Sequence, residues 1–192
     1  VKLMNWNNNI CNIFALIIAA IVLVGCSQSS DLNLITKNSI GLLTNTTQVQ
    51  QLQETFSNDS IVKFIGGDEF TGAINDIEVF DKSGVKLLEV TPKQSLDSTS
   101  TIKMVKIIDE RFSTSKGLTA KSTFNTLSDN YEISDIQNTI RDIIITVKEL
   151  NAFFTIDKKE LPAELRFDMN IKIDALQIPN TAKIKGFYLQ WQ

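Results

Sequence analysis

The chain has 192 residues, of which 43% are hydrophobic, and a formal net charge of −3. This length suits one compact domain with its own hydrophobic core. The acidic balance, without blocks of basic residues, excludes the electrostatic footprint of a nucleic-acid-binding protein. The sequence contains no histidine, which excludes histidine-dependent activation of a nucleophile and histidine-ligated zinc.

The start of the chain resembles a bacterial signal peptide. A polar segment whose only charged residue is Lys2 precedes an unbroken apolar run from Ile13 to Val24. That run is shorter than the roughly 20 residues that span a bilayer core, whereas a basic start and a short apolar region are typical of exported proteins. We therefore expect residues 1–25 to be a signal peptide. The alternative is an uncleaved anchor with Cys26 as an ordinary thiol, but residues 27–30 supply no positive charge to stop transfer.

The end of this segment resembles the lipobox of bacterial lipoproteins. Residues 23–26 read Leu-Val-Gly-Cys, directly behind the apolar run. The resemblance implies cleavage after Gly25 and attachment of lipid, such as palmitate, to Cys26, which makes the membrane a partner through this anchor. Ser27 resembles the signal that sorts lipoproteins to the outer membrane of Gram-negative bacteria, with the domain in the periplasm or at the cell surface. Since Cys11 would leave with the signal peptide, no disulfide is expected.

A short polar tether and one domain are expected to follow. Residues 26–33 are small and polar and lack apolar periodicity, which is typical of a flexible linker. From residue 34 to residue 192, apolar runs alternate with turn signals and no second linker is present. Removal of the signal peptide takes away one charged residue, Lys2, so the formal net charge changes from −3 to −4.

Two segments of this domain share one pattern, which indicates an internal repeat. In each, a Gly-Leu pair precedes a hydroxyl residue at a helix N-cap position, and apolar residues then follow at i, i+3 and i+7. These are Val49, Leu52 and Phe56 in the first segment, and Phe124, Leu127 and Tyr131 in the second. The spacing lines one face of a helix of about three turns. We therefore expect two helices in which Leu52 and Leu127 are buried.

Runs rich in β-branched and aromatic residues predict a set of strands. They cover residues 61–65, 74–80, 85–90, 102–108, 133–136, 140–150, 152–156, 167–173 and 184–191. The segment Asp81-Lys82-Ser83-Gly84 lies between two of them and predicts a hairpin turn. This order gives two α-then-β units, and hence an α+β domain with a mostly antiparallel sheet and helices on one face.

Residues 66–70 spell Gly-Gly-Asp-Glu-Phe, which resembles the signature of diguanylate cyclases. The resemblance implies substrate contacts for Gly66 and Gly67, and metal binding and catalysis for Asp68 and Glu69. The metal-binding aspartate that this family places well before the motif has no counterpart in this sequence, and Phe64 replaces the basic residue usually found two positions before the glycines. We therefore interpret the string as a turn between strands and expect neither a nucleotide nor a metal at it.

The other carboxylates match no spacing with a known mechanism. Three groupings invite an acid–base or cation-binding interpretation: Asp109 with Glu110, Asp142 with Glu149, and Glu160 with Glu164. We expect all three to lie on the solvated surface or in hairpin turns. Five aromatic residues are expected to fill the core and the sheet faces rather than to form a stacking platform. They are Phe153, Phe154, Phe187, Tyr188 and Trp191.

Four features together resemble a family of small envelope lipoproteins, the domain-of-unknown-function family 1131, which includes a sigma-E-regulated enterobacterial member. The features are the lipobox, Ile-Gly-Leu-Leu-Thr at 40–44, Ile-Glu-Val-Phe-Asp at 77–81, and Gly-Leu-Thr-Ala-Lys-Ser-Thr-Phe at 117–124. The segment around residues 68–72 and the region beyond Leu161 depart from the family pattern. The resemblance implies a location and a fold, and it implies no activity and no site.

Two functions fit these features. The leading hypothesis is a non-enzymatic, lipid-anchored envelope protein that binds another envelope component, in outer-membrane assembly or stress response, without a cofactor. The alternative is a carboxylate-dependent hydrolase of cell-wall glycans, since glycosidases need only two acids. Two convergent carboxylates in a deep cleft would favour the hydrolase, and a flat apolar patch would favour the binding protein.

Overall fold

The structure, a computed structural model, describes residues 31–63 and 76–191. All described residues belong to one unit, Asp31–Gln192. The expected signal peptide of residues 1–25 and the expected lipid site at Cys26 lie outside the described residues. The Gly-Gly-Asp-Glu-Phe string at 66–70, with Gly66, Gly67, Asp68 and Glu69, lies outside them as well.

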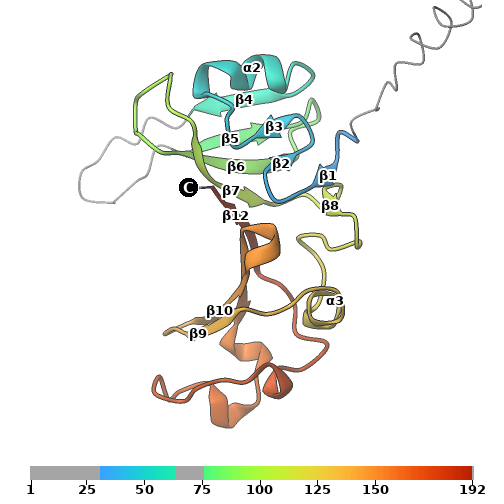
Figure 1. Ribbon diagram of the computed structural model, residues 1–192, viewed down its shortest axis with the longest axis vertical. Helices are drawn as coiled ribbons and strands as arrows, with labels where there is room; N and C mark the ends of the chain where they lie inside the picture. Colours follow the sequence, from blue (N-terminus) through green and yellow to red (C-terminus); the bar gives the residue numbers. More distant parts are fainter. Residues whose placement is uncertain (1–30, 64–75, 192) are drawn as a thin grey trace, which may run out of the picture. The chain divides into compact units, whose positions relative to one another are not determined.

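An eight-stranded sheet in the order β4-β5-β6-β7-β12-β11-β10-β9 forms the centre of this unit (Figure 1). Each neighbouring pair is antiparallel. The strands are β4 (Ser60–Lys63), β5 (Ile77–Phe80), β6 (Lys86–Pro92), β7 (Ile102–Ile107), β9 (Asp135–Asn138), β10 (Asp142–Val147), β11 (Ala152–Asp157) and β12 (Gly186–Gln190). Because β7 pairs with β12, the sheet joins a β4–β7 half to a β9–β12 half.

The two faces of this sheet differ, because side chains alternate along each strand. On one face, which we call the inner face, a row of apolar residues crosses the sheet in register. It consists of Ile61, Val79, Leu88, Ile107, Phe187, Phe154, Ile145 and Ile136. The adjacent row on the opposite, outer face consists of Glu78, Glu89, Lys106, Tyr188, Phe153, Thr146 and Asp135. The inner face thus packs into the hydrophobic core.

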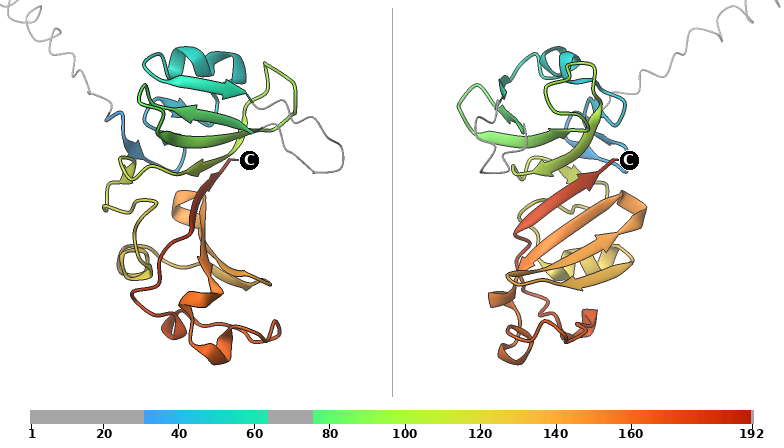
Figure 2. Two further views of the ribbon diagram at one scale, coloured as in Figure 1. Left: turned by 180° about the vertical axis from the view of Figure 1, so that it is seen from behind. Right: turned by 90° about the vertical axis from the view of Figure 1, so that its left-hand side faces the viewer.

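A second, four-stranded sheet in the order β3-β2-β1-β8 adds to this core. Its strands are β1 (Leu34–Ile35), β2 (Ser39–Ile40), β3 (Leu43–Thr44) and β8 (Ser113–Thr114). The buried side chains of Ile35, Ile40 and Leu43 belong to the same apolar cluster as the inner face. In the right-hand view of Figure 2, which faces the outer side of the large sheet, the strands of the β9–β12 half lie in front of the yellow helix.

Residues 31–33, the last part of the expected tether, are held against the domain. The backbone N–H of Ser113 donates to the carbonyl of Asn33 at 3.1 Å. Gly41, at the turn between β2 and β3, has φ +54°, and a Cβ at this position would collide with the carbonyl oxygen of Leu32. Glycine at residue 41 is therefore required both by the left-handed backbone and by this close approach.

The expected α+β class is wrong, because the described chain is mostly β. Its 12 strands are accompanied by α2 (Leu52–Thr55), of 4 residues, and α3 (Phe124–Asn130), of 7 residues. The other helical segments are 3-10 turns. They are η1 (Val49–Gln51), η2 (Lys148–Leu150), η3 (Lys158–Glu160), η4 (Ala163–Leu165) and η5 (Ala175–Gln177). Helices this short form no layer over a sheet, so two α-then-β units with helices on one face do not describe the fold.

Both predicted helices are short because extended backbone precedes them and other segments take their first N–H groups. Gln48 and Thr123, the residues before η1 and α3, have ψ of 155° and 170°. The N–H groups that follow donate to the segments that lead into β7 and β12. These bonds are Val49 to Ser100, Gln50 to Ser98, Phe124 to Ala182 and Asn125 to Asn180. The apolar spacing therefore fits about two α-helical turns or fewer, although Leu52 and Leu127 are fully buried, as predicted.

The hairpin turn predicted at residues 81–84 is confirmed. It joins β5 to β6, and Gly84 has φ +87°. The Ser83 hydroxyl, the Arg111 guanidinium and the Val85 backbone N–H all donate to the Asp81 carboxylate. These donors hold the pKa of Asp81 well below its usual range. The turn is thus fixed by its own acidic residue.

The strand predicted at 167–173 does not form. The Asp168 carboxylate accepts from the Asn170 backbone N–H at 2.8 Å, which makes a local turn of the kind that competes with a strand. The Asn138 side chain, in the edge strand β9, donates to the carbonyls of Asp168 and Ile171, each at 3.0 Å. The segment is therefore held as a loop against β9 by side-chain hydrogen bonds.

Candidate functional site

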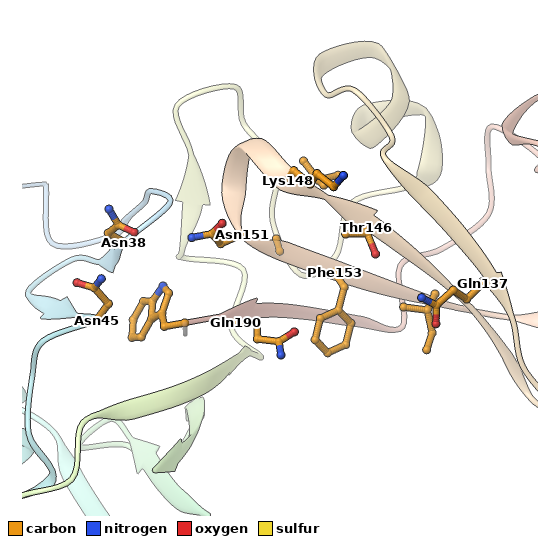
Figure 3. Close-up of a pocket in the computed structure, with 12 residues that line it drawn as sticks. Asn38, Asn45, Gln137, Thr146, Lys148, Asn151, Phe153 and Gln190 are labelled. Carbon is orange, nitrogen blue, oxygen red and sulfur yellow. The ribbon is translucent and has the colours of Figure 1, made fainter. Parts of the chain in front are cut away.

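A trough of about 530 Å³ lies on the outer face of the β9–β12 half (Figure 3). Its polar lining consists of Asn38, Asn45, Gln137, Thr146, Lys148, Asn151 and Gln190. Its apolar lining consists of Ile144, Val147, Ala152, Phe153 and Trp191. Figure 3 shows Asn38 and Asn45 at one end and Gln137 at the other, with Gln190 and Phe153 between them. The trough thus crosses the strands from the edge strand β9 to the loops of the small sheet.

Several elements bring the carboxamides of the trough together. Gln190 is the last residue of β12, and Asn151 follows η2 with φ +51°, a left-handed conformation that asparagine adopts more readily than most residues. Trp191, which is 2% exposed, donates from Nε1 to the carbonyl of Lys37 at 3.1 Å. This bond ties the end of β12 to the β1–β2 turn, and thereby places Asn38 beside the sheet.

Four of these carboxamides are free to bind a ligand. Within the described residues, the side chains of Asn38, Asn45, Asn151 and Gln190 form no hydrogen bond, whereas Gln137 donates to Asp135 at 3.0 Å. Each carboxamide can donate two hydrogen bonds and accept others through its carbonyl oxygen. The trough therefore presents several unused donors and acceptors on one concave surface.

One residue of the trough lining, Phe153, belongs to a stacked aromatic pair. Phe153 and Tyr188 face each other across β11 and β12, with ring centroids 4.6 Å apart and planes at 6°. The Tyr188 ring lies over Gly186, where a Cβ would clash with it. Glycine at this strand position therefore allows the close approach of the ring, and the Lys106 ammonium lies 5.9 Å from the ring centroid on the other side of the pair. The stacking therefore holds the Phe153 ring in place beside the trough.

The five aromatic residues lie where the sequence predicted, in the core and on a sheet face. Phe154, Phe187 and Trp191 are buried in the core. Phe153 and Tyr188 lie on the outer face of the sheet, where they stack on each other. The sequence placed all five in strands without showing which face each would occupy.

Charge is distributed unevenly over the outer face. In the β4–β7 half, Lys86 pairs with Glu78 and Glu89, and Lys106 pairs with Glu89 at 3.6 Å. The lining of the trough in the other half contains no aspartate or glutamate, and Lys148 is its only charged residue. The polar character of the trough therefore comes from neutral side chains.

The structure does not bring the three carboxylate groupings into one site. Asp109 accepts from Arg111 at 3.0 Å, and its neighbour Glu110 is exposed. Asp142 begins β10 and Glu149 lies beyond its end, a separation of roughly 20 Å along a strand. Among the described residues, no group of three histidine, cysteine, aspartate or glutamate side chains is placed to hold a metal ion.

Glu160 and Glu164, the third grouping, lie in two successive 3-10 turns, η3 and η4. Glu160 accepts from the backbone N–H of Lys183 at 3.3 Å, and Glu164 is exposed. Glu160 therefore has a local structural partner.

One carboxylate pair that sequence spacing missed lies across β10 and β11. Asp142 and Asp157 are directly opposite each other, and the Lys185 ammonium binds both, at 2.7 and 3.7 Å. The Lys159 backbone N–H and the charge of Lys185 lower the pKa of Asp157, while the Asp142 hydrogen bond raises the pKa of Lys185. Both shifts favour the charged forms of Asp157 and Lys185, and none of the three residues lines the trough.

No helix among the described residues has both the length and the apolar character needed to cross a membrane. No protein-family model matches the sequence, and no curated protein matches it. The fold is similar to that of a solved structure, the uncharacterized protein yfeY from Escherichia coli, with a TM-score of 0.50 and 11% sequence identity. The likeness covers 82% of this chain and 99% of that chain, and at this identity it shows the fold alone.

Proposed function

We propose that the protein is a lipid-anchored component of a bacterial envelope that binds another envelope component without catalysing a reaction. The lipobox-like residues 23–26 support the anchor, through lipid on Cys26 and insertion in the outer membrane. The trough on the outer face supports the binding role. The resemblance to family 1131 supports the same location.

The single observation that carries the binding role is the lining of the trough. It combines the unengaged carboxamides of Asn38, Asn45, Asn151 and Gln190 with the ring of Phe153, and it lacks acids. Carboxamides do not exchange protons near neutral pH, so they recognise a ligand without activating it. Unused polar groups in a concave site fix the position of a ligand over an apolar surface.

The carboxylates of the described chain give little support to the alternative hydrolase. A glycosidase needs one carboxylic acid kept protonated near neutral pH and a second carboxylate across the scissile bond. Lys185 binds both members of the facing pair Asp142 and Asp157, and the pKa of Asp157 is lowered rather than raised. Asp157 is therefore unsuited to act as the proton donor.

An anchor near the membrane strengthens weak binding. Confinement by a lipid on Cys26 raises the effective concentration of the domain toward other envelope components. The proposal therefore requires both parts: the anchor for location and the trough for recognition.

Labelling and crosslinking test the two parts separately. Cells given labelled palmitate should incorporate it into the wild-type protein and not into Cys26→Ala, which should leave the membrane fraction. A photo-crosslinking residue at Gln190 should capture one specific envelope component, whereas the same residue at Gln53, exposed on α2, should not. Turnover of a cell-wall substrate by the purified protein, abolished by an Asp142 or Asp157 substitution that leaves the fold intact, would refute the non-enzymatic role.

A further inference from the structure

We infer that the trough binds a neutral oligosaccharide whose units carry hydroxyl or acetamido groups. This inference rests on the proposed binding function and adds the chemical class of the ligand. Three properties of the lining carry it: the hydrogen-bonding groups, the charge and the apolar side chains of Phe153 and Ile144.

The free carboxamides select for ligand groups that both donate and accept hydrogen bonds. Asn38, Asn45, Asn151 and Gln190 are unengaged within the described residues, so a ligand that covers them must supply both kinds of partner at several points. Sugar hydroxyl and acetamido groups do so. A wholly apolar ligand would desolvate the carboxamides without pairing them, which is unfavourable.

The charge of the trough favours a neutral ligand. Lys148 is the only charged residue in its lining. Polymers rich in phosphate or carboxylate groups are recognised by several arginine or lysine side chains acting together, and a polycation would need carboxylates. The lining offers neither set, which leaves uncharged polar ligands.

The apolar part of the lining gives a sugar ring a surface to contact. Tyr188 covers one face of the Phe153 ring, and the rest of that ring lines the trough together with Ile144. A pyranose ring has C–H groups on its faces and hydroxyl groups around its rim. Its C–H groups can pack on Phe153 and Ile144, while the carboxamides of the lining reach the polar rim.

The length and placement of the trough favour a chain of several sugars over a peptide. Neighbouring strands are about 4.8 Å apart, so the distance from β9 to β12 is roughly 14 Å. An extended peptide binds through its backbone to an open strand edge, but β10 and β11, which form the floor, are each paired on both sides. The floor offers side chains and no free backbone, which suits an oligosaccharide.

Isothermal titration calorimetry on the full chain tests the inference. The chain is kept in micelles of a phosphocholine detergent, because a detergent with a sugar head group would compete for the trough. The probes are the tetramer of N-acetylglucosamine, cellotetraose and a capped, uncharged tetrapeptide. At least one tetrasaccharide should bind, and Gln190→Ala and Asn45→Ala should each weaken its binding about fivefold, as expected for one lost hydrogen bond.

Two further variants separate recognition from folding. Phe153→Leu keeps an apolar side chain and removes the flat ring, and it should weaken tetrasaccharide binding about tenfold. Gln53→Ala removes an exposed carboxamide that does not line the trough and should change nothing. Since Gln190 is itself exposed, its substitution leaves the fold intact and keeps the test valid if Phe153→Leu unfolds.

The outcomes distinguish this inference from the proposed function. Absence of tetrasaccharide binding at millimolar concentration, or binding that Gln190→Ala leaves unchanged, overturns the oligosaccharide assignment. Binding of the tetrapeptide alone, weakened by Gln190→Ala, overturns the ligand class and supports a binding role for the trough. Cleavage of a bound tetrasaccharide supports the ligand class and overturns the non-enzymatic function.

Discussion

Truncation of Leu127 to alanine should destabilise the protein by about 3 to 5 kcal/mol. Leu127 is the central apolar residue of α3, lies between the buried Phe124 and Tyr131, and has 0% exposure. A buried leucine changed to alanine costs about 2 to 5 kcal/mol, depending on how far the site collapses. Because Leu127 lies within the continuous hydrophobic core, we expect the upper part of that range.

Leu127 is important for the stability of α3 because this helix is short. The helix has 7 residues, well below the roughly 12 to 15 that an isolated helix needs for stability in water. Its conformation therefore depends on the buried face. A loss of about 3 to 5 kcal/mol is a large share of the 5 to 15 kcal/mol typical of a domain.

Urea unfolding followed by far-UV circular dichroism measures this change. Asp129→Ala, at an exposed position on the same helix, is the matched control and should shift the free energy of unfolding by about 0.5 kcal/mol or less. Leu52→Ala, in the other helical segment, should behave like Leu127→Ala because it is equally buried. A loss below about 1 kcal/mol for Leu127→Ala, with an unchanged urea dependence, would show that the core does not hold α3.

Three other substitutions test separate contacts. Trp191→Phe removes the indole donor to the Lys37 carbonyl and should cost about 1 to 2 kcal/mol in the same urea assay; no change would mean that this bond does not join β12 to the β1–β2 turn. Asp81→Asn should destabilise the protein near neutral pH, because a carboxylate with a lowered pKa stabilises the fold above its unfolded pKa. That difference should shrink as the pH falls below about 4, and a difference that grows in acid would contradict the assignment. Gly186→Ala should displace the Tyr188 ring, with changed aromatic chemical shifts in NMR spectra, and unaltered shifts would argue against the stacked pair.

Strands in which apolar and polar residues alternate were predictable from the sequence, because such alternation indicates that one face of the strand is buried. Residues 77–80 and 86–92 pair around the turn that begins at Asp81, and β7, β10 and β12 fall within predicted runs. The lengths of the two helices were overestimated, because an i, i+3, i+7 spacing of apolar residues indicates which residues are buried and not how many helical turns form between them. Hydrogen bonds from Val49 and Phe124 to distant segments limit the number of helical turns. No local sequence pattern predicts these hydrogen bonds.

The trough could not be predicted, because its residues come together only through the pairing of distant strands. Asn38 and Gln190 lie far apart in the sequence, and the bond from Trp191 to the Lys37 carbonyl brings their segments together. A lone asparagine or glutamine in a loop or at a strand end carries no motif. Phe153 and Tyr188 were visible as aromatic residues in strands, but their shared face follows from the register between β11 and β12.

The contrast between the two halves of the outer face bears directly on function. In the β4–β7 half, Lys86 forms ion pairs with Glu78 and Glu89, so these charged side chains already have partners within the protein. In the β9–β12 half, carboxamides such as Asn151 and Gln190 have no protein partner within the described residues, beside the half-buried Phe153 ring in a concave site. Without a ligand these accessible carboxamides bind water. The ligand that we propose would replace this water by pairing with the carboxamides and would cover the apolar part of the lining.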